Sequence, residues 1–300
     1  MFEPIIRMKI QLTVLAGLLS LAAPLHAQLP VGSHYPIGAE GIKGASLPPP
    51  GVYLRDYNFF YAANKVDGMP NGPDIFAYVQ APRLIWMTPW TILDANYGMD
   101  VIVPFAYKNI AAPFGDGRQF NLADIQLEPL LLSWHFQQFD LSACEAVWAP
   151  TGKFDVDTPA KDLTSPGAGF WTEMLTLGGV WYPDAKKTWA LSLLDRYEIN
   201  SRQEHTHITP GEMFTAEWGV SKTVMPGVDA GIVGYYQQLV TKDSGTGASP
   251  YYSDVVGVGP EISAFWPKIK TFTSLRSEYE VTAKNRPQGV TSILTVTKIF

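Results

Sequence analysis

The side chains with the clearest chemical potential are carboxylates and arginines that recur at alternate positions of β-rich segments. In the segment 120–134, Asp124 and Glu128 alternate with Ile125 and Leu127. Successive side chains of a strand point to opposite faces, so this spacing collects charge on one face. We expect that face to line an interior that favours cations or neutral polar solutes over anions; the alternative is that the acids pair with arginines and water and serve only to satisfy the interior. The predicted lining residues are Asp94, Asp100, Asp124, Glu128, Arg196, Glu217, Glu261, Arg276, Glu278 and Glu280.

Catalytic and metal-binding chemistry has weak support. His205 and His207 are two residues apart in a polar loop without a third histidine nearby, which is a poor zinc signal. His135 has Ser133 close by, but strand neighbours at i and i+2 do not make a catalytic triad, and no G-x-S-x-G motif occurs. The sequence therefore predicts no enzyme, no metal and no cofactor, unless His135 or His205 lies in a cluster with serine and an acid.

The composition indicates strands that face something other than plain water. The 300 residues are 13% aromatic and only 17% charged, with 26 glycines and 24 prolines, whereas about 25% charged residues is usual for soluble domains. A formal net charge of −6 argues against a nucleic-acid partner, which requires a basic patch. The single cysteine, Cys144, excludes an internal disulfide.

The first 27 residues predict a secretory signal peptide. Arg7 and Lys9 precede an apolar run over 10–23, and Ala27 is a small residue at a plausible cleavage site. The run is shorter than the roughly 20 residues that a membrane-spanning helix needs, which disfavours an uncleaved anchor. No later apolar run is long enough for such a helix, so a membrane-embedded chain would have to be a barrel.

Residues 52–300 alternate strand-like segments with breaks of alternating length. Long Gly/Pro-rich breaks such as NKVDGMPNGPD and KNRPQG alternate with short ones such as TPW and MPG. This rhythm is typical of an all-β, antiparallel up-and-down transmembrane β-barrel with short periplasmic turns and long extracellular loops. The twelve predicted strands are 52–64, 74–88, 92–108, 120–134, 138–150, 169–182, 187–200, 212–223, 228–241, 251–266, 270–283 and 289–300; the faces of the first, second, fifth and ninth cannot be assigned.

Tryptophans and the last residue agree with a barrel in lipid. Indole rings gather where one edge is hydrated and the ring lies in lipid, and six tryptophans beside predicted short turns would form such a girdle. The last strand would pair with the first and close the wall, leaving no free edge. Its terminal Phe300 resembles the signal that bacterial outer-membrane assembly machinery reads. The predicted girdle is Trp86, Trp90, Trp134, Trp181, Trp189 and Trp266.

The Gly/Pro-rich segment 28–51 is a candidate lumen plug, which we expect to fold back from a periplasmic rim that holds both termini; the alternative is a disordered periplasmic tail. The stretch HYPIGAEGIKGASLPPPGVYLRDYNFFY, residues 34–61, resembles the opening of a family of transporter-like outer-membrane barrels named for the meta pathway of phenol degradation. The resemblance implies a bacterial outer-membrane channel, in contact with lipid, for passive passage of small solutes, with aromatic or hydrophobic compounds as candidates. The alternative is a structural or binding barrel with a blocked lumen. The sequence does not identify the solute or the oligomeric state.

Overall fold

The computed structural model describes residues 29–66, 72–112 and 115–300 of the chain. The predicted signal peptide lies outside these residues. Fourteen strand segments among the described residues form one antiparallel sheet. They are β1 (Gly51–Val66), β2 (Asp74–Ile92), β3 (Ala95–Ile102), β4 (Phe105–Ala111), β5 (Gly117–Leu122), β6 (Ile125–His135), β7 (Phe139–Ala149), β8 (Thr172–Trp181), β9 (Trp189–Asn200), β10 (Met213–Met225), β11 (Val228–Leu239), β12 (Asp254–Trp266), β13 (Thr271–Lys284) and β14 (Pro287–Ile299), with the helix α2 (Pro159–Thr164) and the 3-10 turn η1 (Pro267–Ile269).

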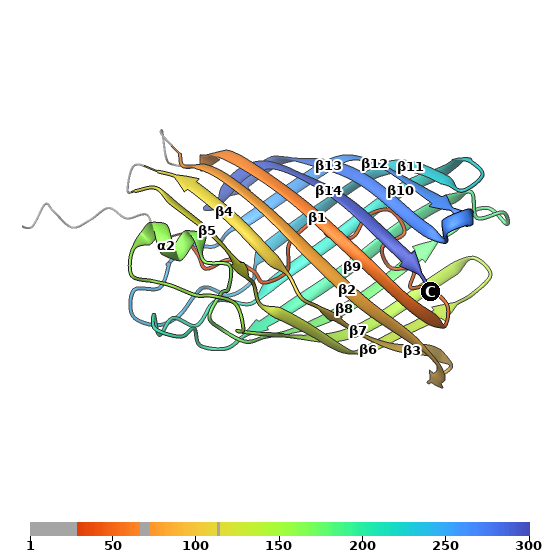
Figure 1. Ribbon diagram of the computed structural model, residues 1–300, viewed down its shortest axis with the longest axis horizontal. Coiled ribbons are helices and arrows are strands. Elements are labelled where there is room, and N and C mark those ends of the chain that lie inside the picture. The colour runs from red at the N-terminus through yellow and green to blue at the C-terminus, as the bar shows by residue number, and fades with distance from the viewer. Residues whose placement is uncertain (1–28, 67–71, 113–114) are drawn as a thin grey trace, which may run out of the picture.

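The fourteen segments make twelve wall strands, as the sequence predicts. β3 and β4 both pair with β2 and continue one strand across a break at residues 103–104, and β5 and β6 continue another across 123–124. Pro104 lies in the first break, where its missing N–H cannot contribute to the ladder. β1 pairs with β14 from Tyr53↔Ile299 to Val66↔Pro287 and with β2 on its other side, so the barrel closes (Figure 1).

The two rims differ in the length of their connections. Tight turns at 93–94, 136–138, 226–227 and η1 lie on the rim that holds Phe300, and the long connections 150–171, 201–212 and 240–253 lie on the other. Two connections differ from expectation. Asn285 and Arg286 alone join β13 to β14, where KNRPQG predicts a long loop, because Asn285 adopts a left-handed φ of 52° that permits a tight hairpin. On the short-turn rim, the connection 182–188 is longer than the other turns.

The outer wall is apolar and carries the predicted tryptophans at one rim. Outward-facing side chains along the strands, among them Leu84, Leu193, Ile232 and Leu294, are exposed. All six girdle tryptophans lie near the short-turn rim, where the indole N–H of Trp134 donates to the Leu93 carbonyl at 2.9 Å. Among the described residues, no helix is long and apolar enough to cross a membrane.

Candidate functional site

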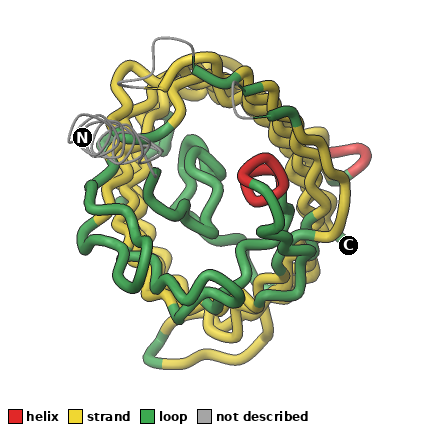
Figure 2. Tube along the Cα trace, turned by 90° about the vertical axis from the view of Figure 1, so that its left-hand side faces the viewer, coloured by secondary structure: helices red, strands yellow, loops and turns green. Residues whose placement is uncertain are grey.

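Residues 29–50 pass through the inside of the barrel from the long-loop rim to the short-turn rim (Figures 1 and 2). We call these residues the lumenal segment. Near its start, the backbone N–H of Val31 donates to Asp243, in the 240–253 loop, at 2.8 Å. Near its end, the Ser46 hydroxyl donates to Asp140, the second residue of β7, at 2.6 Å. The expectation that the segment starts at the short-turn rim, predicted to be periplasmic, is therefore wrong: Leu29 lies at the opposite, long-loop end.

At the long-loop rim, the lumenal segment is anchored by two buried carboxylates, Glu198 and Asp243. Glu198 accepts the backbone N–H groups of His34 and Tyr35, each at 3.1 Å, and the hydroxyl of Ser33. In the loop above, Asp243 accepts Gly211 N–H at 2.9 Å as well as Val31. Burial raises the pKa of the Asp243 carboxyl above its ordinary value, although these two N–H donors act to lower it.

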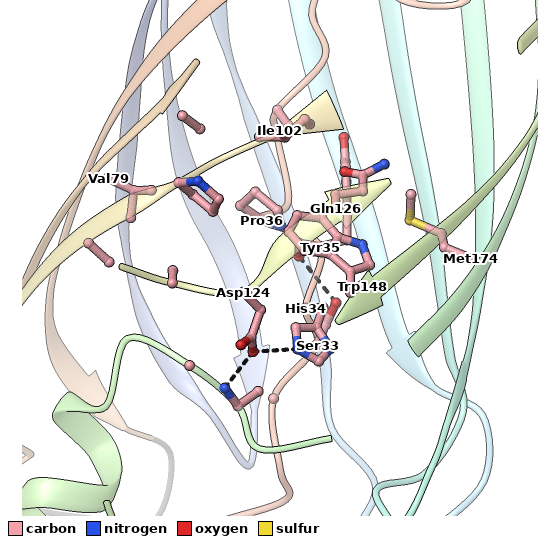
Figure 3. A pocket seen from close by; sticks show the side chains of 18 of the residues that line it. Ser33, His34, Tyr35, Pro36, Val79, Ile102, Asp124, Gln126, Trp148 and Met174 are labelled. Carbon is pink, nitrogen blue, oxygen red and sulfur yellow. Dashed lines mark hydrogen bonds and ion pairs between the residues drawn. The ribbon is translucent and has the colours of Figure 1, made fainter. Parts of the chain in front are cut away.

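His34 joins the lumenal segment to three wall strands. Its Nε2 lies 2.8 Å from Asp124 and its Nδ1 lies 2.7 Å from the Thr172 hydroxyl. Its ring stacks on Trp148 at a centroid distance of 5.7 Å and meets the edge of Phe170 at 4.5 Å. Because both ring nitrogens have partners and two aromatic rings pack against the imidazole, the position of the segment at this level is closely defined (Figure 3).

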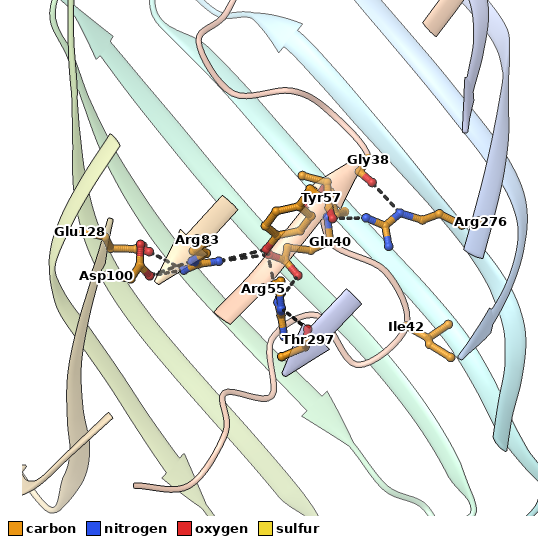
Figure 4. Close-up of polar contacts among 12 residues, drawn as sticks. Gly38, Glu40, Ile42, Arg55, Tyr57, Arg83, Asp100, Glu128, Arg276 and Thr297 are labelled. Carbon is orange, nitrogen blue, oxygen red and sulfur yellow. Dashed lines mark hydrogen bonds and ion pairs between the residues drawn. The ribbon is translucent and has the colours of Figure 1, made fainter. Parts of the chain in front are cut away.

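An ionic layer crosses the lumen at the level of Glu40 (Figure 4). Glu40 lies 3.2 Å from Arg55 of β1 and 3.3 Å from Arg83 of β2, and it accepts the Tyr57 hydroxyl at 2.6 Å. Arg83 also contacts the wall carboxylates Asp100 at 2.5 Å and Glu128 at 2.6 Å. The ionic layer, defined as these six residues, thus links the lumenal segment to four strands, and its buried charges are paired.

The lumenal segment has glycines where it passes close to β12 and β13. Gly38 has a φ of +78°, which favours glycine, and its carbonyl accepts Arg276 Nε at 2.7 Å. At Gly41, an added Cβ would overlap the Glu261 carboxylate, which accepts Ile42 N–H at 2.8 Å. Close approach to the wall therefore explains glycines in the HYPIGAEGIKG stretch.

A cavity of about 1,460 Å³ lies between the lumenal segment and the wall from β1 to β9. We call it the chamber. Its apolar lining includes Phe59, Val79, Ile102 and Met174 of the wall and Tyr35 of the lumenal segment (Figure 3). Residues of the 154–168 connection line its extracellular end, and Arg83 and Glu128 of the ionic layer border it deeper in the lumen. The volume exceeds the roughly 300–1,000 Å³ usual for small-molecule pockets.

Most of the predicted lining residues face the interior, but packing against other groups buries them. Glu217 pairs with Arg196 and accepts the Tyr35 hydroxyl, and Glu261 lies 3.6 Å from Arg276. Asp94 is a correction. It lies in the tight turn after β2, with a left-handed φ of 62° and an exposed side chain, so it is at the rim instead of the lumen. The buried residues of the predicted set are Asp100, Asp124, Glu128, Arg196, Glu217, Glu261, Arg276, Glu278 and Glu280.

The sequence prediction missed the centre of the ionic layer. Arg55 and Arg83 lie on β1 and β2, two of the four strands whose faces could not be assigned, and Glu40 lies outside every strand. A signal was present, since an arginine in an otherwise apolar strand needs an acidic partner. Its partner could not be identified, because Glu40 and Arg83 are brought together only by the path of the lumenal segment.

Ser133, His135 and Asp140 are brought together at the short-turn rim. The Ser133 hydroxyl lies 3.0 Å from His135 Nε2, and His135 Nδ1 lies 3.0 Å from Asp140. His135 therefore lies in a rim cluster with a serine and an acid, which is the arrangement for which the sequence left an enzyme open. The Ser133 side chain is buried and is not part of the chamber lining, while Asp140 also accepts the hydroxyls of Ser46 and Tyr182 at 2.6 Å each. The cluster thus has the contacts of a triad without an accessible nucleophile, and it fastens the lumenal segment.

The predicted metal candidates are not assembled into a site. His205 and His207 both have left-handed backbone conformations, with φ of 63° and 64°. Within the described ranges, no three His, Cys, Asp or Glu side chains are grouped to hold a metal ion.

Sequence and structure comparisons agree with this architecture. A family model described as "Putative MetA-pathway of phenol degradation" matches residues 60–295. The chain belongs to this family. No curated protein sequence matches it. Its fold is similar to that of an outer membrane channel from Pseudomonas putida F1, with a TM-score of 0.74 and 15% identity over 89% of this chain and 100% of that one.

Two autotransporter barrels are more distant matches to this family member. The β domain of the Bordetella autotransporter BrkA has a TM-score of 0.53 at 11% identity, covering 84% of this chain and 100% of that one. The translocator domain of NalP from Neisseria meningitidis has a TM-score of 0.53 at 9% identity, covering 86% and 91%. The closed barrel, its apolar outer wall and these likenesses place the family member in the bacterial outer membrane, as the sequence predicts.

The path of the lumenal segment predicts surface access near its start. Gly32 is exposed, and an added side chain would meet open space. In a Cys144→Ala background, Gly32→Cys should react on intact cells with a maleimide coupled to a polyethylene glycol too large for porins. Lys242→Cys on the long-loop rim should react likewise, whereas Lys268→Cys in η1 should react only after the outer membrane is permeabilised. Labelling of Gly32→Cys that requires permeabilisation would contradict this topology.

Proposed function

We propose that the protein is an outer-membrane channel that passes small apolar solutes, including aromatic ones, by way of the chamber. The observation that carries the proposal is the size and apolar lining of the chamber, which lies within the lumen directly beneath the extracellular connections. An apolar molecule that enters the chamber would leave water and contact Phe59, Val79, Ile102 and Met174. The free energy gained would be about 25 cal/mol per Å² of apolar surface removed from water.

The ionic layer supports selectivity against water-soluble solutes. Arg55, Arg83 and Glu40 lie across the lumen with their charges paired, so an ion passing this level would have to displace charged groups that are already satisfied. An apolar solute needs neither hydration nor a counter-charge, and it could pass when the lumenal segment moves slightly aside. Family membership supports an aromatic solute, because the family is described by a pathway of phenol degradation.

The test is uptake of an apolar fluorophore by cells. N-phenyl-1-naphthylamine is excluded by an intact outer membrane and fluoresces in lipid. Expression of the full chain in a Gram-negative host should accelerate its entry relative to a host that expresses an unrelated closed barrel. The purified protein in liposomes should pass sugars slowly. Fluorophore entry equal to the unrelated barrel would sink the channel proposal and favour the alternative of a binding or structural barrel with a blocked lumen.

Narrowing the chamber should slow this uptake. Val79→Trp places a bulky ring among the apolar lining residues, and we expect the rate of fluorophore entry to fall by about threefold, because the indole narrows the apolar path without filling the chamber. Val290→Trp is the matched control, since Val290 is a strand valine that faces outward. Equal rates for the two variants at equal expression would contradict passage through the chamber.

Assembly provides a further role for the C-terminus. We infer that outer-membrane assembly machinery binds the last strand through Phe300. Its ring is exposed at the short-turn rim, and its N–H donates to the Val52 carbonyl at 3.1 Å in the closed barrel.

A further inference from the structure

The outer wall of β1 and β2 carries a polar cluster within the apolar belt. Arg55 and Tyr57 face the lumen, so Asp56 and Asn58 face outward. The carboxamide nitrogens of Asn58 and Gln80 donate to Asp56 Oδ2 at 3.1 and 3.2 Å, and the Tyr78 hydroxyl donates to Asn58 Oδ1 at 2.8 Å. We call Asp56, Asn58, Tyr78 and Gln80 the outer polar cluster.

The outer polar cluster lies well inside the membrane. Val52 pairs with the girdle residue Trp86, and Asp56 is four residues farther from the short-turn rim. Four strand residues extend about 13 Å, which is about 10 Å of depth at the usual barrel tilt, inside an apolar band about 25 Å tall. Exposed Leu54, Phe60 and Leu84 surround the cluster on the same face. A carboxylate at this depth is unfavourable against lipid tails, which offer no hydrogen-bond donor.

The outer polar cluster is also incompletely satisfied within the chain. Asp56 Oδ1 is buried within the chain, and Oδ2 already accepts two carboxamide N–H groups. Gln80 is exposed on the wall, and only one of its N–H groups is used on Asp56. Its second N–H and its carbonyl oxygen are therefore a donor and an acceptor that can reach beyond the chain.

We propose that the outer polar cluster is the centre of a two-fold interface with a second copy of this chain. A two-fold axis brings the same patch to itself, so the exposed Gln80 carboxamides of the two copies can donate to and accept from each other. Lipid headgroups lie at the membrane interface, about 10 Å away in depth, and cannot supply these partners. Leu54, Phe60 and Leu84 provide apolar packing around the polar centre, which matches the usual anatomy of membrane interfaces.

Cysteine cross-linking in membranes tests the interface. In the Cys144→Ala background, Asn58→Cys lies near the proposed axis, and Ala62→Cys lies on the same exposed face of β1 should Asn58→Cys fail to fold. The control is Leu191→Cys, which is exposed on β9, the strand diametrically across the barrel. Copper phenanthroline should produce a disulfide-linked dimer from the β1 variants and not from the control. Cross-linking of both β1 variants no higher than that of Leu191→Cys would overturn the proposal.

A second measurement separates polar recognition from chance contact. The double variant Asp56→Leu with Gln80→Leu keeps an apolar wall and removes the hydrogen bonds, so its dimer dissociation constant in mild detergent should rise about tenfold or more. Light scattering on the size-exclusion eluate measures the mass. An unchanged dissociation constant, or a wild-type chain that is monomeric in native-membrane extracts, would overturn the proposal. Neither readout depends on solute passage.

Discussion

Deletion of residues 30–48 should turn a barrel of low conductance into an open, cation-selective pore. The lumenal segment occupies the interior along its whole length, and a twelve-stranded barrel without it is wider than the packed eight-stranded case. Water would fill the vacated space and hydrate Glu198, Glu217 and Glu261, which the segment now covers. We expect single-channel conductance to rise by at least about tenfold, with a reversal potential that favours cations because carboxylates then line the pore.

The deletion has a clear control for folding. A folded barrel resists unfolding in cold detergent and shifts on a gel when heated, so the shift must persist in the deleted chain. Gly41→Ala is the matched point variant, because its methyl group would press on Glu261 and loosen one contact without emptying the lumen. A deleted chain that folds but conducts no better than the full chain would show that the lumenal segment is not what closes the barrel.

The barrel could be predicted because its determinants are local. Alternation within strands, the spacing of turns and tryptophans near one rim are each set by a few neighbouring residues, and they correctly indicate twelve wall strands. The errors arise where a single residue changes local geometry. Asn285 makes a two-residue hairpin from a Gly/Pro-rich stretch, and Asp94 adopts a left-handed conformation that moves it from strand to turn. Pro104 divides a wall strand without interrupting its register.

The site could be predicted only in part because it depends on contacts distant in sequence. The alternating acids indicate an inward face, but the sequence does not say that Tyr35, Gly38 and Ile42 would cover them. The contact of Asp140, the partner of His135, with Ser46 was missed for the same reason, since nothing in a strand pattern reports the path of an irregular segment. The direction of that path is set by paired anchors at both rims, Asp243 and Asp140, which lie in distant parts of the chain.

Glu40→Gln should produce the largest loss of stability among single substitutions in the lumenal segment. The substitution removes the charge that faces Arg55 and Arg83, whereas Arg83 keeps Asp100 and Glu128. Arg55 keeps only neutral partners, the hydroxyls of Thr297 and Tyr57, among the described residues. Breaking a buried ion pair from one side costs about 3–5 kcal/mol, chiefly because the remaining charge stays buried. We expect the free energy of unfolding in phospholipid vesicles to fall by about 3 kcal/mol.

A double variant decides whether the unpaired charge is the cause. If Arg55 left without its carboxylate accounts for the loss, then Glu40→Gln combined with Arg55→Met should be more stable than Glu40→Gln alone, since no unpaired guanidinium remains. If lost packing of the lumenal segment accounts for it, the second substitution should add a further loss. Lys161→Ala is the control for surface charge, because the pairing of this exposed α2 lysine with Asp157 should contribute little to stability. The sign of the coupling between residues 40 and 55 therefore tests whether the ionic layer holds the lumenal segment by charge.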